Sequence, residues 1–176
     1  MKRPYVVIAL LLLIGVLIIS LTSTSQQIDQ SFDGVWYQLG EENADYEEPV
    51  TVEFNGELKK SLFRNLTFVG TIAIDDHVMP GTDARDDELE LVFDDGICKN
   101  SETIDYIGND RIETYGTLCV NDDFSEFMIT ILEQTENGGT WKGEDGQVIA
   151  GPAHSREEAL RITNQLMAEY LVKPLE

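Results

Sequence analysis

The segment DARDDELELVFDDG, residues 83–96, has the residue types of a cation site, because seven of its fourteen residues carry a carboxylate. A calcium site needs six to eight oxygen ligands that converge on one point, usually from a tight loop that contains glycine. The aspartates here do not have the offsets of the DxDxDG pattern, and Arg85 would place a positive charge among the ligands. Leucines and Phe93 alternate with glutamates over residues 88–93, which is the period of a β-strand. The pattern therefore favours a strand with a solvated acidic face over a dedicated calcium site.

A looser calcium site stays open as an alternative. It would draw on aspartates from one long connection that follows a predicted strand and precedes the alternating segment. The residues are Asp75, Asp76, Asp83, Asp86 and Asp87.

Carboxylates could also serve a hydrolase acting on a cell-wall or carbohydrate substrate, which needs one protonated and one ionised carboxyl about 5–9 Å apart. The two histidines, His77 and His154, lie in no metal-ligand or nucleophile motif. Trp36 and Trp141 could stack on sugars, but aromatic residues at strand positions more often belong to a core. We assign no catalytic and no cofactor-binding residue, and we favour a protein that is not an enzyme.

Cys98 and Cys119 are the only cysteines in the chain. An even number of cysteines in an exported domain permits a disulfide, and their spacing excludes a CxxC redox motif. Turn residues and then a strand lie between them, so the two sulfurs could face each other across neighbouring strands. We favour a structural bridge over two free thiols.

The N-terminus predicts contact with a membrane. Residues 5–21 (YVVIALLLLIGVLIISL) are uncharged, and as a helix they would be about 26 Å long, just enough for a bilayer core of about 30 Å. Lys2 and Arg3 precede this run and the next basic residue is Lys59, so the N-terminus should stay in the cytoplasm. A cleaved signal segment within residues 1–25 is the alternative, and the protein would then be secreted.

The charge of the exported part excludes some partners. All 33 acidic residues follow residue 25, together with 10 of the 12 basic residues, which gives a net charge of −23. This excess argues against nucleic acid, whose binding depends on lysine and arginine. It favours solubility and a basic or cationic partner at the cell surface.

The hydrophobic pattern predicts an α+β fold, a mainly antiparallel sheet covered by one C-terminal helix. Short alternating runs occur at residues 50–60, 66–75, 89–93, 115–120, 126–133 and 141–149. We expect a hairpin with its turn at Asn55 and Gly56, and another hairpin over residues 141–149.

After residue 152 the period becomes helical. Ser155 and Glu158 match a capping box, and the apolar spacing predicts an amphipathic helix of about 17 residues that ends before Pro174. We expect residues 1–25 to form the start and span, residues 26–33 a linker, and residues 34–176 one domain.

Four segments carry a resemblance to a group of proteins. Residues 55–63 (NGELKKSLF), 68–74 (FVGTIAI), 115–120 (YGTLCV) and 151–160 (GPAHSREEAL) resemble segments of small membrane-anchored extracytoplasmic proteins of Gram-positive bacteria. The resemblance implies a bacterial, wall-facing location, and it implies no activity and no site residues.

These observations predict a non-catalytic binding or interaction module held at the outer membrane face. Sequence patterns of strands, turns and a helix cap run through the whole exported part, whereas no catalytic motif accompanies them. The two rival hypotheses are the calcium-binding domain and the carboxylate-dependent hydrolase.

Overall fold

The computed structural model describes residues 24–60, 66–75, 77–79, 88–108, 111–135 and 138–176. The predicted span at residues 5–21 lies outside these residues. Within them, no helix is long and apolar enough to cross a membrane.

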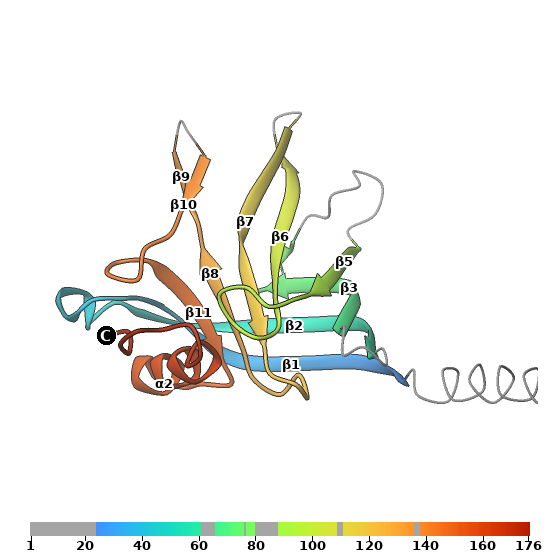
Figure 1. The fold of residues 1–176 in the computed structure, drawn as a ribbon, viewed down its shortest axis with the longest axis horizontal. Helices are drawn as coiled ribbons and strands as arrows, with labels where there is room; N and C mark the ends of the chain where they lie inside the picture. Colours follow the sequence, from blue (N-terminus) through green and yellow to red (C-terminus); the bar gives the residue numbers. More distant parts are fainter. Residues whose placement is uncertain (1–23, 61–65, 76, 80–87, 109–110, 136–137) are drawn as a thin grey trace, which may run out of the picture.

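The architecture is a mainly antiparallel sheet with one C-terminal helix, which confirms the predicted α+β class (Figure 1). The strands are β1 (Thr24–Gln38), β2 (Glu47–Lys60), β3 (Leu66–Ile74), β4 (His77–Val78), β5 (Leu89–Phe93), β6 (Ser101–Gly108), β7 (Arg111–Val120), β8 (Phe127–Ile131), β9 (Glu133–Thr135), β10 (Gly138–Thr140) and β11 (Gln147–Gly151). A short 3-10 helix, η1 (Glu41–Asn43), follows β1, and α2 (Arg156–Leu166) follows β11.

The main sheet curls so far that its two ends meet. Its order is β4-β3-β2-β1-β11-β8-β7-β6, with β5 also paired to β3, and β9 with β10 forms a separate hairpin. Asp94, just after β5, exchanges two backbone hydrogen bonds with Ser101 at the start of β6, at 3.1 and 2.9 Å. This pair joins the two end strands and encloses the interior of the domain.

Aromatic side chains fill that interior. Phe54 is fully buried, and its ring lies against four other rings, with centroid distances of 5.9, 6.1, 5.1 and 5.3 Å to Phe32, Phe68, Phe124 and Phe127. Strand β5 contributes Leu89, Leu91 and Phe93 in an alternating burial pattern, so the predicted strand with leucines inward is confirmed.

The helix covers the outer face of β1, β8 and β11. Odd-numbered residues of β1 point to this face, and Tyr37 donates a hydrogen bond from its buried hydroxyl to Thr163 Oγ1 at 2.7 Å. Burial raises the pKa of the Tyr37 hydroxyl well above its usual range, so it stays protonated and remains a donor. The Ser155 hydroxyl accepts from the Glu158 backbone N–H at 3.3 Å, which confirms the predicted N-cap.

The helix is shorter than predicted, with 11 residues instead of about 17. The chain leaves the helix at Met167. Leu171 and Leu175 then pack against the outer cluster, the buried apolar residues that α2 shares with the sheet, which include Tyr37, Met128, Val148 and Ile162. Tyr170, the last residue of the apolar spacing that predicted the longer helix, lies beyond the helix and is 41% exposed, so its spacing was coincidental.

The hairpin predicted at Asn55 and Gly56 is wrong, since β2 runs straight through both residues. Gly56 lies opposite Gly70 of β3 and Ile28 of β1. A two-residue turn would put Leu58 on the face opposite Phe54, whereas both are buried on one face. Glycine is needed here for close strand approach, because a Cβ on Gly56 would lie 2.2 Å from the Val69 carbonyl oxygen.

Two further expectations fail. Residues 26–33, predicted as a linker, belong to β1, where Ile28 is buried and the whole segment pairs with β2. The polar residues that suggested a linker are the solvated positions of a strand. Of the hairpin predicted over residues 141–149, only β11 is a strand, and its partners are β1 and β8.

We expect Gly56→Ala to lower the free energy of unfolding by about 1–3 kcal/mol, because the added methyl group forces β2 and β3 apart. Urea denaturation measures the change. Gly143→Ala is the control, since its Cβ would contact only the flexible end of Leu175, at 3.2 Å. Equal stability of the two variants would contradict the close approach.

Candidate functional site

The structure describes one of the five aspartates predicted to bind calcium. Asp75 follows β3 with a φ of 49°, and its Oδ1 accepts a hydrogen bond from the Thr51 backbone N–H at 2.8 Å. Asp76, Asp83, Asp86 and Asp87 lie outside the described residues. In the described part of the chain, no three potential ligand side chains gather to hold a metal. The calcium site therefore stays a prediction, and Asp75 has a role in fixing the end of β3.

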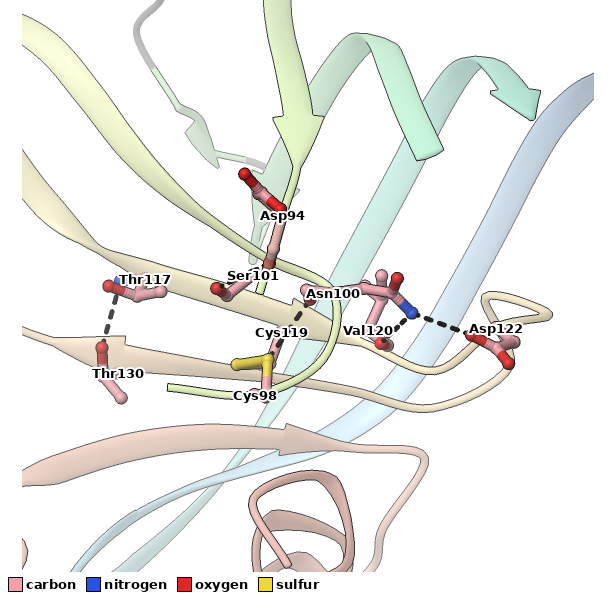
Figure 2. The surroundings of a disulfide bond; sticks show 9 residues. All are labelled: Asp94, Cys98, Asn100, Ser101, Thr117, Cys119, Val120, Asp122 and Thr130. Carbon is pink, nitrogen blue, oxygen red and sulfur yellow. Dashed lines mark hydrogen bonds between the residues drawn. A yellow bond between two sulfur atoms is a disulfide. The ribbon is translucent and has the colours of Figure 1, made fainter. Parts of the chain in front are cut away.

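The two cysteines form the predicted disulfide (Figure 2). Cys98 lies in the connection between β5 and β6, Cys119 lies in β7, and their Cα atoms are 6.2 Å apart. Both side chains are buried against the cluster beneath α2. The bridge thus fastens the connection that closes the sheet onto the neighbouring strand, which is a structural role.

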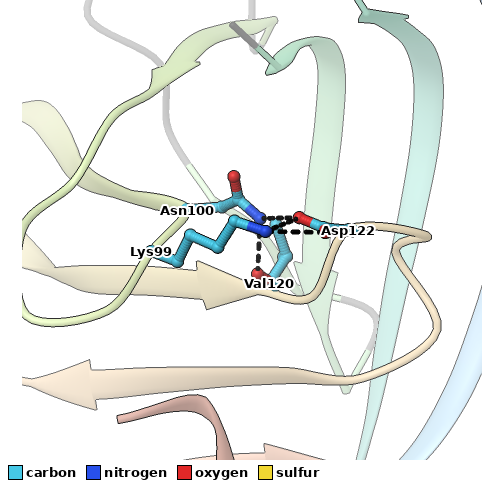
Figure 3. A network of polar contacts seen from close by, with 4 residues as sticks. All are labelled: Lys99, Asn100, Val120 and Asp122. Carbon is cyan, nitrogen blue, oxygen red and sulfur yellow. Dashed lines mark hydrogen bonds and ion pairs between the residues drawn. The ribbon is translucent and has the colours of Figure 1, made fainter. Parts of the chain in front are cut away.

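A polar network lies beside the disulfide (Figure 3). The Lys99 ammonium contacts both carboxylate oxygens of Asp122, at 2.8 and 2.7 Å, and Asn100 Nδ2 donates to Asp122 Oδ1 at 3.1 Å and to the Val120 carbonyl at 3.3 Å. These contacts join the β5–β6 connection to the turn after β7.

The Asp122 carboxyl of this network is ionised at neutral pH. Hydrogen bonds from Lys99 and then Asn100 hold the pKa of the Asp122 carboxyl below its usual value of 3.8. A lowered folded-state pKa means that the contribution to stability is present above about pH 3.8 and is lost as the pH falls further. Both partners are at least half exposed, so solvent screens the pair and its contribution is small.

An acidic groove lies at the far end of β1, and it is the candidate binding site. It encloses about 440 Å³ and is lined by Gly40, Glu41, Glu42, Gly143, Glu144, Leu171, Val172, Lys173, Pro174, Leu175 and Glu176. Carboxylates come from the turn after β1, from Glu144 and from Glu176, and the apolar lining residues belong to the C-terminal segment. Glu41, Glu42 and Glu144 form no salt bridge within the described part of the chain.

Gly40 sets the shape of the groove. Its φ is 98°, a backbone conformation that side chains rarely adopt, and a Cβ there would lie 2.8 Å from the Glu144 carbonyl oxygen. The Gly40 N–H donates to the Glu176 carbonyl at 2.6 Å, and the Arg156 guanidinium donates to the Gly40 carbonyl at 3.2 Å. These bonds bring the turn after β1, the C-terminal segment and α2 to one place.

Asn164 of α2 holds the apolar part of the groove lining. Its side chain makes two hydrogen bonds to the backbone of Leu175, from Nδ2 to the carbonyl at 3.1 Å and from the N–H to Oδ1 at 2.7 Å. The C-terminal segment is thereby fixed against the helix, so the groove has a preformed shape.

We expect Asn164→Ala to lower the free energy of unfolding by about 1–2 kcal/mol, because both hydrogen bonds to Leu175 are lost. Amide exchange of residues 171–176 should accelerate more than that of β11. Asn164→Asp keeps the acceptor and loses the donor, so its free energy of unfolding should fall between that of the unmodified protein and that of Asn164→Ala. Unchanged exchange in Asn164→Ala would show that the apolar contacts alone hold the segment.

The two tryptophans have structural contacts. Trp36 packs against the interior and donates from its indole to Gln147 Oε1 at 3.1 Å. Trp141 packs against the outer cluster and donates to the Gln147 carbonyl at 3.0 Å. Their half-buried rings and bonded N–H groups match the core interpretation better than a sugar-binding platform.

The groove was not predicted from the sequence. The sequence feature that could have indicated the groove is the presence of acidic residues in two turn-rich segments, 41–48 and 144–145. Their convergence depends on the pairing of β1 with β11, which brings Gln38 opposite Gln147. No local pattern in either segment specifies that pairing.

In comparisons with known proteins, no protein-family model, curated protein or solved structure matches this chain. The resemblance to membrane-anchored Gram-positive proteins therefore stays a prediction.

Proposed function

We propose that the protein is a non-catalytic binding module, anchored in the cell membrane through residues 5–21, whose acidic groove binds a basic partner outside the cytoplasm. The groove itself is the observation that supports this proposal. Its carboxylates are exposed and form no salt bridge within the described residues. A basic side chain of a partner can therefore pair with them.

The apolar residues that line the groove support a partner that is both basic and apolar. Val172 is fully exposed, and Leu171 and Pro174 also line the groove. Lys173 is the basic residue among the lining residues. A peptide or protein surface with lysine or arginine next to an apolar side chain complements both the carboxylates and the apolar residues of this lining.

The disulfide supports an extracytoplasmic position. Bridges such as Cys98–Cys119 persist in oxidising environments and are rare in the cytoplasm. The net charge of −23 beyond residue 25 suits attraction of cationic partners over distances up to about 8–10 Å at physiological salt.

Calorimetry of the full chain in detergent with a lysine- and leucine-containing peptide tests the proposal. We expect Glu41→Gln combined with Glu42→Gln to weaken binding about tenfold at low salt, since two attractive charges are lost. Glu53→Gln combined with Glu157→Gln is the matched control, because both glutamates are exposed and neither lines the groove. Undetectable binding by the unmodified chain, or equal effects of the two double variants, would refute the proposed function.

A further inference from the structure

A second cavity lies at the end of the domain where β1 begins. Its volume is about 320 Å³. It is lined by Lys60, Leu66, Lys99, Asn100 and Asp122. Two lysines against one aspartate make this lining net positive, whereas four glutamates against one lysine make the lining of the acidic groove net negative. The cavity therefore suits an anion, although the exported part as a whole carries a net charge of −23.

The strand pattern of β2 places Lys60 at this cavity. Residues two positions apart in a strand share a face, and Val52, Phe54 and Leu58 are buried on the inward face of β2. Lys60 continues this row at the last residue of the strand, where it is exposed. Its alkyl chain can thus lie over the end of the interior while its ammonium stays in solvent.

The network beside the disulfide supplies the other side of the cavity. Lys99 and Asn100 both point at Asp122 (Figure 3). Their hydrogen bonds lower the pKa of the Asp122 carboxyl most, and the nearby charge of Lys60 adds to this effect. Two ammonium groups therefore lie around one carboxylate.

Both ammonium groups can bind a further acceptor. Lys60 forms no salt bridge within the described residues. The Lys99 side chain is half exposed, and an ammonium has three donors. A phosphate oxygen at the cavity can therefore accept from both lysines while Asp122 keeps its own contacts.

The cavity lies close to the membrane in a chain anchored as we propose. Lys60 pairs with Thr24, which follows the predicted span by three positions, and three residues extend over at most about 10 Å. The head-group layer beside the bilayer core is itself about 5–7 Å thick. Figure 1 shows this end of β1 opposite the end that carries α2 and the C-terminal segment.

We propose that the cavity between Lys60 and Lys99 binds the phosphate group of an anionic lipid in the membrane that anchors the chain. This inference rests on the anchoring part of the proposed function and assigns a second contact with the same membrane. The acidic groove lies at the other end of β1, so the lipid contact turns the groove away from the membrane and toward a partner.

Calorimetry of the full chain in non-ionic detergent micelles, with phosphatidylglycerol added to the micelles, tests the proposal. Phosphatidylcholine is the neutral reference and should give no saturable heat. Glycerol phosphate carries the same phosphate chemistry in soluble form and should bind at least about tenfold more weakly, because the anchor holds the cavity beside the micelle and its lipids.

Substitutions at the cavity give effects of opposite sign. Lys60→Gln should weaken phosphatidylglycerol binding about fivefold, the effect of one lysine near an anionic surface, whereas Lys60→Arg should bind like the unmodified chain. Lys142→Gln is the matched control, because this lysine is exposed and does not line the cavity. Asp122→Asn should strengthen binding about fivefold, since it removes the carboxylate that competes for both ammonium groups. A purely structural network would give weaker binding in that variant.

Flotation with phosphatidylcholine vesicles separates the lipid site from the anchor on which it rests. A chain that floats but does not bind phosphatidylglycerol would overturn the lipid site and leave the anchor intact. Equal binding of glycerol phosphate, or equal effects of Lys60→Gln and Lys142→Gln, would also overturn the lipid site. A chain that neither floats nor binds phosphatidylglycerol would overturn both.

Discussion

Phe54→Ala should lower the free energy of unfolding by about 3–5 kcal/mol, the largest effect we expect from one side chain in this domain. The Phe54 ring is fully buried at the centre of the interior and contacts rings from β1, β3, β8 and the turn before β8. Removing it leaves a cavity that the surrounding aromatic rings cannot fill by small movements, because rigid planar groups repack poorly.

Chemical denaturation with guanidinium, followed by tryptophan fluorescence, measures this change. Phe54→Leu is the graded control and should cost clearly less, because it keeps most of the apolar volume. Val92→Ala is the surface control, because this residue is 44% exposed, and its effect should stay within about 0.5 kcal/mol. An effect below about 1 kcal/mol for Phe54→Ala would mean that the interior is loosely packed.

Loss of the Cys98–Cys119 bridge should have the second largest effect, about 3 kcal/mol. The cysteines are 21 positions apart, and closing a loop of this size restricts the unfolded chain by about that amount. Replacing both by alanine avoids leaving one free thiol. The midpoint of guanidinium denaturation should then fall, and added reductant should change the unmodified protein in the same direction but leave the double variant unchanged.

The position of the bridge gives this prediction a local signature. Amide exchange at Asp94 and Ser101 should accelerate more in the double variant than exchange at β2, because the bridge fastens the connection between β5 and β6 to β7. Uniform acceleration across the domain would show that the bridge acts only on the unfolded chain.

Local patterns in the sequence predicted those parts of the fold that depend on neighbouring residues. The alternation of Leu89, Leu91 and Phe93 identified β5 and its buried face, and Ser155 with Glu158 identified the start of α2. Asn55 and Gly56 misled the prediction because the same dipeptide suits both a tight turn and a close strand crossing. The unbroken burial phase from Val50 to Leu58 is the signal that separates the two cases.

The groove and the sheet closure could not be predicted in this way, because both depend on long-range pairing. Asp94 and Ser101 carry no sequence pattern that pairs them, yet their two hydrogen bonds join the ends of the whole sheet. Gly40 and Glu144 lie in different turns, and only the register of β1 with β11 brings them together. Such contacts are fixed by the sum of many strand pairs and have no local sequence pattern.

Strand β1 has a mechanical consequence in a chain anchored as we propose. It begins at Thr24, three residues after the predicted span, and ends at Gln38, beside the groove. Its 15 residues are already extended, so at about 3.3 Å per residue they cover about 50 Å. A force applied by a partner at Gly40 would reach the membrane along this one covalent strand. The strand cannot lengthen further, so the domain would transmit the pull without having to unfold.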